Sequence, residues 1–290
     1  MKTRYIPSTA AARSARAPGL RQTAPPAAPW GWALFGLLCG LLLTLLLGAP
    51  ARWLGSAVRL ASDGQVQLPD ARGTLWHGSA QLMFTGGPAS RDRLALPGRL
   101  HWHWQLDAQG LGLTLQADCC MRERSTVWLS AGAQGLSLQL QAHQSRWPAS
   151  LLAGLGAPWN TLQAQGQLAL ASDGLRLDLS GWPTQAQALR WQLQGQAVLD
   201  AQAMASRLSP LQPMGSYRVT LRGHGAQQPP SLQLTTVEGA LQLSGQGQWV
   251  GTRLRFAGEA SAAPGHEAAL DNLLNIIGRR QGTRSLLSLG

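Results

Sequence analysis

A chain of 290 residues is long enough for one large domain or two small ones, so its length leaves the domain count open. Only 13% of the residues are charged, about half of the usual share, and Lys2 is the single lysine, which argues against a solvated helical protein. Of the net charge of +11, +5 precedes the apolar run described next, and the remaining +6 comes from scattered arginines. These form neither a dense cluster nor a recognisable nucleic-acid-binding module, so no nucleic-acid partner is expected.

The first predicted element is an uncharged apolar run at 30–49, WGWALFGLLCGLLLTLLLGA. As a helix rising about 1.5 Å per residue, this run would cross about 30 Å of hydrocarbon, which predicts a single transmembrane helix. Residues 1–29 are rich in Ala, Pro and Arg and contain no acidic residue, which predicts a disordered basic tail on the cytoplasmic side. Residues 50–290 are then expected on the opposite side of the membrane.

A cleavable secretory signal is the alternative interpretation of the same run, because Ala49-Pro50-Ala51 loosely resembles a small-residue cleavage site. The run is longer than the usual apolar core of a signal, and proline is a poor residue at such a site, so the sequence favours the anchor. Either interpretation carries the remaining residues across the membrane.

Residues 50–290 consist largely of short alternating apolar and polar runs separated by turn residues, the pattern of antiparallel strands with one buried face. The fold class is therefore predicted to be mainly β, with an antiparallel sheet domain that is either open or sandwich-like. Hairpins are predicted around three turns, at 107–110, at 172–174 and near Gly251. Further strands are expected at 135–142, 189–199 and 217–222.

Two segments interrupt the β pattern. One or two helical turns are predicted at 150–156, after Pro148, and they place a soft domain boundary near 147–160. Apolar residues recur at helical spacing over 266–277, between Gly265 and Gly278, which predicts one short C-terminal helix. A last edge strand is expected at 285–289.

Few residues have a pattern that would support catalysis or ligand binding. His101 and His103 project to one face of a predicted strand, but a zinc site needs three or four ligands, so they are interpreted as exposed histidines and no metal site is predicted. The chain contains no Gly-x-Ser-x-Gly elbow and no recognisable carboxylate pair. We therefore expect no catalytic residue, no cofactor and no enzymatic activity.

Cys119 and Cys120 are adjacent and would lie in an oxidising compartment, which favours a vicinal disulfide between them. A pair of small buried thiols is the alternative. The third cysteine, Cys39, falls within the apolar run.

Three segments resemble a known family. Gly73, Thr74, Leu75, Trp76 and Gly78 form a Gly-Thr-Leu-Trp-x-Gly sequence that resembles the signature near the start of the periplasmic region of type II secretion system protein N. The sequence at 151–158 is similar to that family's middle Leu-Gly-x-Pro element. The sequence at 272–282, which includes Gly278, Arg279 and Arg280, resembles its closing motif. Together they cover the chain from about Trp30 to the end, although the long tail departs from the family.

The resemblance implies a single-pass inner-membrane subunit of the apparatus that exports folded proteins from the periplasm, with a cytoplasmic N-terminus and a periplasmic β domain. It implies no enzymatic residues, and it gives the motif residues structural roles. The expected partners are other type II secretion subunits, bound through exposed sheet edges or the terminal segment. The alternative function is a membrane-tethered module that binds or transfers lipid, because a Leu-lined β structure with few charges presents an apolar groove to acyl chains.

Overall fold

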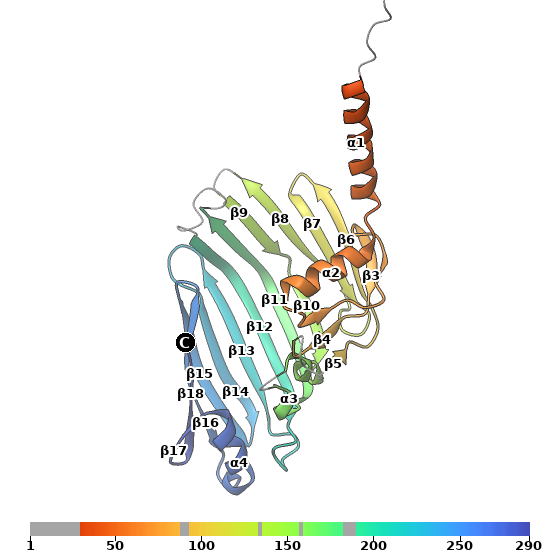
Figure 1. Ribbon diagram of the computed structural model, residues 1–290. Helices are drawn as coiled ribbons and strands as arrows, with labels where there is room; N and C mark the ends of the chain where they lie inside the picture. Colours follow the sequence, from red (N-terminus) through yellow and green to blue (C-terminus); the bar gives the residue numbers. More distant parts are fainter. Residues whose placement is uncertain (1–29, 88–92, 133–134, 157–158, 182–189) are drawn as a thin grey trace, which may run out of the picture. The chain divides into compact units, whose positions relative to one another are not determined.

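The computed structural model describes residues 30–87, 93–132, 135–156, 159–181 and 190–290. The chain divides into two units, residues 1–44 and 45–290, which are described separately below. Antiparallel strands make up most of the second unit, which confirms the mainly β prediction (Figure 1). The predicted tail at 1–29 lies outside the described residues.

Helix α1 (Trp30–Leu47) contains no charged residue, and its leucine side chains with a described exposure are exposed. Within the part of the chain that the structure describes, no helix combines the length and the hydropathy that crossing a membrane requires. The transmembrane helix predicted at 30–49 is therefore not confirmed.

In the second unit, helix α2 (Ala51–Ala61) follows the end of α1, and five short strands come after it. Helix α2 was not predicted from the sequence. Of the five strands, β1, β4 and β5 form a small separate sheet, whereas β2 and β3 belong to the edge of the large sheet. Their bounds are β1 (Val66–Gln67), β2 (Arg72–Gly73), β3 (His77–Ala80), β4 (Met83–Thr85) and β5 (Arg93–Ala95).

The large sheet has 15 strands in the order β17-β18-β16-β15-β14-β13-β12-β11-β9-β8-β7-β6-β3-β2, with β10 paired to β11. Every pair is antiparallel, and among the described residues the sheet ends at β17 and β2 with no pairing between these two edges, as expected for the open alternative of the prediction. Its longer strands are β6 (Leu100–Asp107), β7 (Gly110–Ala117), β8 (Ser125–Gly132), β9 (Gly135–Leu140), β10 (His143–Pro148), β11 (Gln165–Ser180), β12 (Arg190–Ala205), β13 (Gly215–His224), β14 (Ser231–Gly239), β15 (Leu241–Val250) and β16 (Arg253–Ala262). The C-terminal edge consists of β17 (Arg279–Gln281) and β18 (Arg284–Leu289).

Two of the three predicted hairpins are confirmed. Strands β6 and β7 are joined by the turn expected at 107–110, and β15 and β16 are joined at Gly251. The third prediction is wrong, because β11 runs without a turn through Ser172 and Gly174 and forms a β-bulge there. The Ser172 hydroxyl accepts a hydrogen bond from the Gly174 amide (3.2 Å) and donates one to the Gln196 carbonyl (3.1 Å), and Gly174 has a φ of 115°.

The bulge lies where β11 changes its partner. On one side of it β11 pairs with β10, and on the other side it pairs with β9, while β12 accompanies its full length. The extra residue keeps the leucines on both sides of the bulge on the same face of the sheet. The residues from Ser172 to Gly174, which suit a turn, therefore form the point at which β11 changes its partner strand, and the chain continues in the same direction.

The register places apolar side chains of successive strands on one face, because directly paired residues point the same way. Leu129, Leu138, Leu177 and Leu193 stand opposite one another on four adjacent strands, β8, β9, β11 and β12. We call these four, with the paired Leu221 and Leu232 of β13 and β14, the leucine face. All six are half-buried, whereas Arg176 of β11 and Gln194 of β12, on the other face of the sheet, are exposed.

Helical segments cover parts of the same face and form three buried clusters with it. Leu270, Leu273 and Leu274 of α4 (Glu267–Ile277) pack on Tyr217 and Leu241. A second cluster includes Leu151 of the 3₁₀ helix η1 (Ala149–Leu155), and a third includes Ala51 of α2. The leucine face belongs to none of them.

The helices predicted at 150–156 and 266–277 are thus confirmed as η1 and α4. A further short helix, α3 (Trp159–Leu162), precedes β11. Strands on both sides of the segment 147–160 belong to the same large sheet, and a domain boundary there stays a prediction.

Candidate functional site

The sequence at 73–78 forms a tight turn between β2 and β3. The Thr74 amide donates to the His77 carbonyl (2.9 Å), and the Thr74 hydroxyl accepts from the His77 amide (3.2 Å). Gly73 has a φ of 87°, and a Cβ there would lie 2.6 Å from the His77 carbonyl oxygen. The first residue of the motif is therefore confined to glycine by the turn itself.

Two tryptophans of β6 fix this turn to the sheet. The buried Trp102 donates from Nε1 to the Leu75 carbonyl (3.0 Å), and a Cβ on Gly78 would lie 2.7 Å from its Cζ2. The Trp104 amide donates to the Trp76 carbonyl (2.7 Å). Gly78 thus provides the space in which the Trp102 ring packs.

The same turn holds the chain where it leaves α1. The Leu75 amide donates to the Ala49 carbonyl (2.7 Å), and Pro50 forms an isolated β-bridge with Thr74. Ala49 and Ala51 are 3% and 1% exposed, so this connection is part of the packed structure. The motif therefore joins the edge of the sheet to the residues that follow the apolar helix.

Arg99 is a central residue of this region that the sequence analysis missed. Its guanidinium bonds to the Asp70 carboxylate (Nη1 to Oδ2, 2.6 Å) and donates to the Ser79 carbonyl (3.1 Å), while its amide donates to the Asp118 carboxylate (3.1 Å). The Arg99 hydrogen bond, followed by the one from Arg72, holds the pKa of Asp70 below its ordinary value. No local sequence signal marks Arg99, because its partners lie far from it in the chain.

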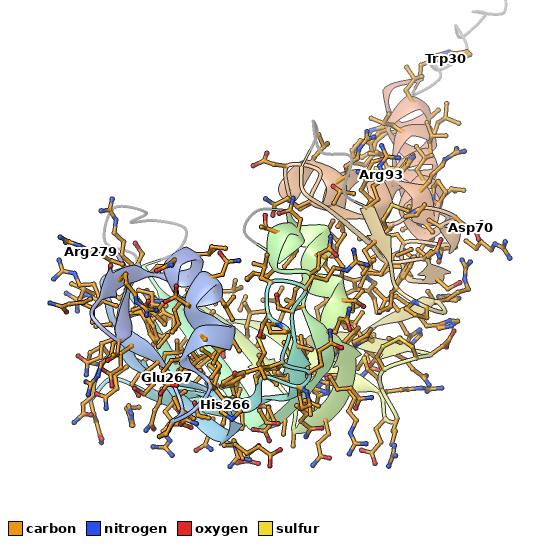
Figure 2. All side chains as sticks on the ribbon, turned by 90° about the horizontal axis from the view of Figure 1, so that it is seen from below. Trp30, Asp70, Arg93, His266, Glu267 and Arg279 are labelled. Carbon is orange, nitrogen blue, oxygen red and sulfur yellow. A yellow bond between two sulfur atoms is a disulfide. The ribbon has the colours of Figure 1, made fainter. Side chains whose placement is uncertain are left out.

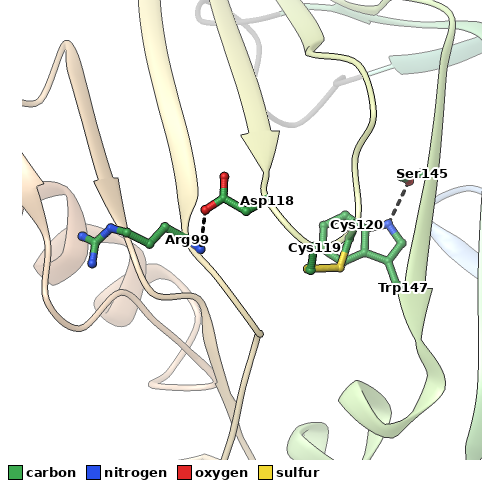
Figure 3. The surroundings of a disulfide bond; sticks show 6 residues. All are labelled: Arg99, Asp118, Cys119, Cys120, Ser145 and Trp147. Carbon is green, nitrogen blue, oxygen red and sulfur yellow. Dashed lines mark hydrogen bonds between the residues drawn. A yellow bond between two sulfur atoms is a disulfide. The ribbon is translucent and has the colours of Figure 1, made fainter.

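Cys119 and Cys120 are joined by a disulfide in the turn that follows β7 (Figure 3). Cys120 is buried against Leu151 and Trp147, and its carbonyl accepts from the Arg146 amide at 2.7 Å. Trp147 in turn donates from Nε1 to the Ser145 hydroxyl at 2.8 Å. The disulfide turn therefore connects the end of β7 to β10.

The C-terminal motif holds α4 against β18. A Cβ on Gly278 would lie 2.5 Å from the Leu286 carbonyl oxygen, and Arg280 bonds to the Asp271 carboxylate of α4 (2.9 Å). Arg279 is exposed on β17. The two motifs do not come together, since β2 and β17 are the opposite edges of the large sheet, and Asp70 and Arg279 lie far apart in Figure 2.

The two histidines singled out from the sequence have different partners. His101 Nε2 lies 3.2 Å from the Asp118 carboxylate, and the His103 ring lies beside His77 with centroids 5.7 Å apart. Over the described ranges, no three His, Cys, Asp or Glu side chains gather as a metal site would require.

Comparison with characterised proteins and with solved structures gave no significant match. The family model of type II secretion system (T2SS) protein N matches residues 64–286, a range that contains both motifs and the disulfide. The chain therefore belongs to the type II secretion system protein N family.

Proposed function

We propose that this chain is a non-catalytic, single-pass inner-membrane subunit of the type II secretion system that acts by binding other subunits. Membership in the family supports a role in type II secretion. The uncharged helix α1 supports the anchor. The basic residues of 1–29, a segment that contains no acidic residue, support an N-terminus in the cytoplasm and a β unit in the periplasm.

The observation that carries the proposal is the incomplete edge at the C-terminal end of the sheet. Strand β17 pairs only with residues 284–286 of β18, whereas β16 pairs with β18 as far as Leu289. Residues 287–289 thus have no strand on their outer side among the described residues, and Leu289 is 61% exposed. A strand of another subunit can add to such an edge through backbone hydrogen bonds.

The first test is deletion of the gene, which should stop export of secreted proteins while their synthesis continues. Normal export in the deleted strain would contradict the proposal.

Affinity capture of the full chain from native membranes should bring other secretion subunits with it.

The edge itself is tested by Leu289→Lys, because a lysine on an edge strand opposes strand addition. Val237→Lys is the matched control, since Val237 is 58% exposed on β14, away from this edge. We expect loss of captured subunits with the first variant only. Equal capture with both variants would exclude this edge as the contact.

The leucine face favours a second candidate function, a tethered module that binds or transfers lipid. Four of its six leucines are paired side by side across β8, β9, β11 and β12, and Leu221 and Leu232 are paired across β13 and β14. All six lie outside the buried clusters, so they offer an apolar surface to acyl chains. Native mass spectrometry should then detect lipid that copurifies with the chain.

A photoreactive amino acid placed at Leu177 should cross-link to that lipid, whereas one placed at the neighbouring Arg176 should not, because the two side chains occupy opposite faces of β11. Equal cross-linking at both positions, or none at Leu177, would contradict the lipid function.

A further inference from the structure

Helix α2 has apolar residues on two opposite sides, and only one side is packed against protein. Ala51 and Leu54 belong to the buried cluster around Trp102. Trp53 and Leu60, two helical turns apart, project to the other side and are 50% and 75% exposed. Packing against the sheet therefore accounts for the apolar residues on one side of the helix. It does not account for the exposed Trp53 and Leu60 on the other side.

Two arginines lie beside these exposed residues. Arg52 and Arg59 are also two turns apart, both are exposed, and neither forms an ion pair with any residue that the structure describes. The helix contains no acidic residue, and the next one in sequence is Asp63. The exposed side of α2 thus combines positive charge with a tryptophan and a leucine.

The position of α2 in the chain points to its partner. Only Gly48, Ala49 and Pro50 separate it from α1, and the hydrogen bond from the Leu75 amide to the Ala49 carbonyl holds that short connection to the sheet. If α1 spans the bilayer, α2 has to lie within a few residues of the membrane surface. The inference therefore rests on the anchor in the proposed function.

We infer that the exposed side of α2 docks on an anionic phospholipid surface. Trp53 and Leu60 insert at the boundary between headgroups and acyl chains, where an indole ring and an aliphatic side chain are both favoured. Arg52 and Arg59 extend from the same side to the lipid phosphates. Because the opposite side of α2 is packed on the sheet, this contact sets the orientation of the sheet relative to the membrane.

The test uses the full chain in lipid nanodiscs, with Cys39→Ser so that no other free thiol reacts while Cys119 and Cys120 stay bonded. An environment-sensitive fluorophore is attached through Leu60→Cys, or through Val237→Cys as the control at a similarly exposed site. The nanodiscs contain phosphatidylcholine with or without phosphatidylglycerol, and quenching is measured with spin-labelled lipid.

We expect the label at position 60 to show a blue-shifted emission and strong quenching by the spin-labelled lipid when phosphatidylglycerol is present, and the label at position 237 to show neither. Adding Arg52→Glu and Arg59→Glu should reverse both effects while the chain stays in the nanodisc. Emission from position 60 that is typical of water in both lipid compositions would overturn the inference. A blue shift without quenching would also overturn it, because protein and not lipid would then cover the helix.

Failure of the anchor gives a different result. A chain that does not remain with nanodiscs at high salt would contradict the proposed membrane span, whatever the label at position 60 reports.

Discussion

Trp191 of β12 contacts Trp249 of β15 in an edge-to-face arrangement, with ring centroids 6.1 Å apart, although β13 and β14 lie between these two strands in the sheet. The Trp191 Nε1 also donates to the Gly251 carbonyl at 3.0 Å. The contact is reached because β13 ends at His224 and β14 begins at Ser231, so the intervening hairpin stops short of both rings. The sheet therefore bends sharply here and brings β12 close to the β15–β16 turn.

The Trp191 contact predicts energetic coupling between strands that do not pair. In a double-mutant cycle, Trp191→Ala and Trp249→Ala should show a coupling free energy of about 1 kcal/mol, the usual size for an aromatic pair. Urea unfolding of the full chain in detergent measures it. Trp191→Ala combined with Trp104→Ala should be additive, since Trp104 packs in the cluster around Trp102. Additivity in the first cycle would show that the two rings do not stabilise the bend.

Gly78→Ala should destabilise the chain by about 1–3 kcal/mol, because the added methyl group meets both the Arg72 carbonyl oxygen at 2.5 Å and the Trp102 ring at 2.7 Å. Gly132→Ala on β8 is the matched control, since no atom lies within 4 Å of a Cβ there. Thermal unfolding of both variants provides the comparison. Equal stability of the two variants would contradict the packing of Trp102 on the motif turn.

Denatured but unreduced protein should contain one reactive thiol, that of Cys39, because Cys119 and Cys120 are bonded to each other. Reduction should raise the count to three. Thiol titration under denaturing conditions measures both values. Three thiols before reduction would mean that the two adjacent cysteines are not bonded in the purified protein.

Burial lowers the pKa of His143 below its ordinary value of 6.5. At pH values between the His143 pKa of the folded chain and that of the unfolded chain, the unfolded chain binds more protons. The free energy of unfolding is therefore highest above about pH 6.5, and it falls as the pH decreases toward the His143 pKa of the folded chain. His143→Gln should reduce this slope. The free energy of unfolding measured from pH 7.5 down to pH 5 tests it, and an unchanged slope would assign the pH dependence to other groups. Asp70, whose pKa is lowered from 3.8, contributes only at lower pH.

Local sequence pattern predicted those elements whose partners are near in the chain. The β6–β7 and β15–β16 hairpins and α4 fall where the periodicity and the turn residues place them. Helix α2 was missed because its eleven residues follow an apolar run directly and show no strong start signal, with Pro50 preceding them in place of a capping side chain.

The alternation of leucine with polar residues was sufficient to determine that this chain builds strands with one apolar face, because side chains on a strand point to opposite faces in turn whatever the strand pairs with. Tertiary structure decided the partners. The residues Ser172 to Gly174 suit a turn and a bulge equally well, and only the pairing of β11 with β9, β10 and β12 selects the bulge. The bend at Trp191 and the bonds of Arg99 likewise depend on residues distant in sequence, which no local pattern encodes.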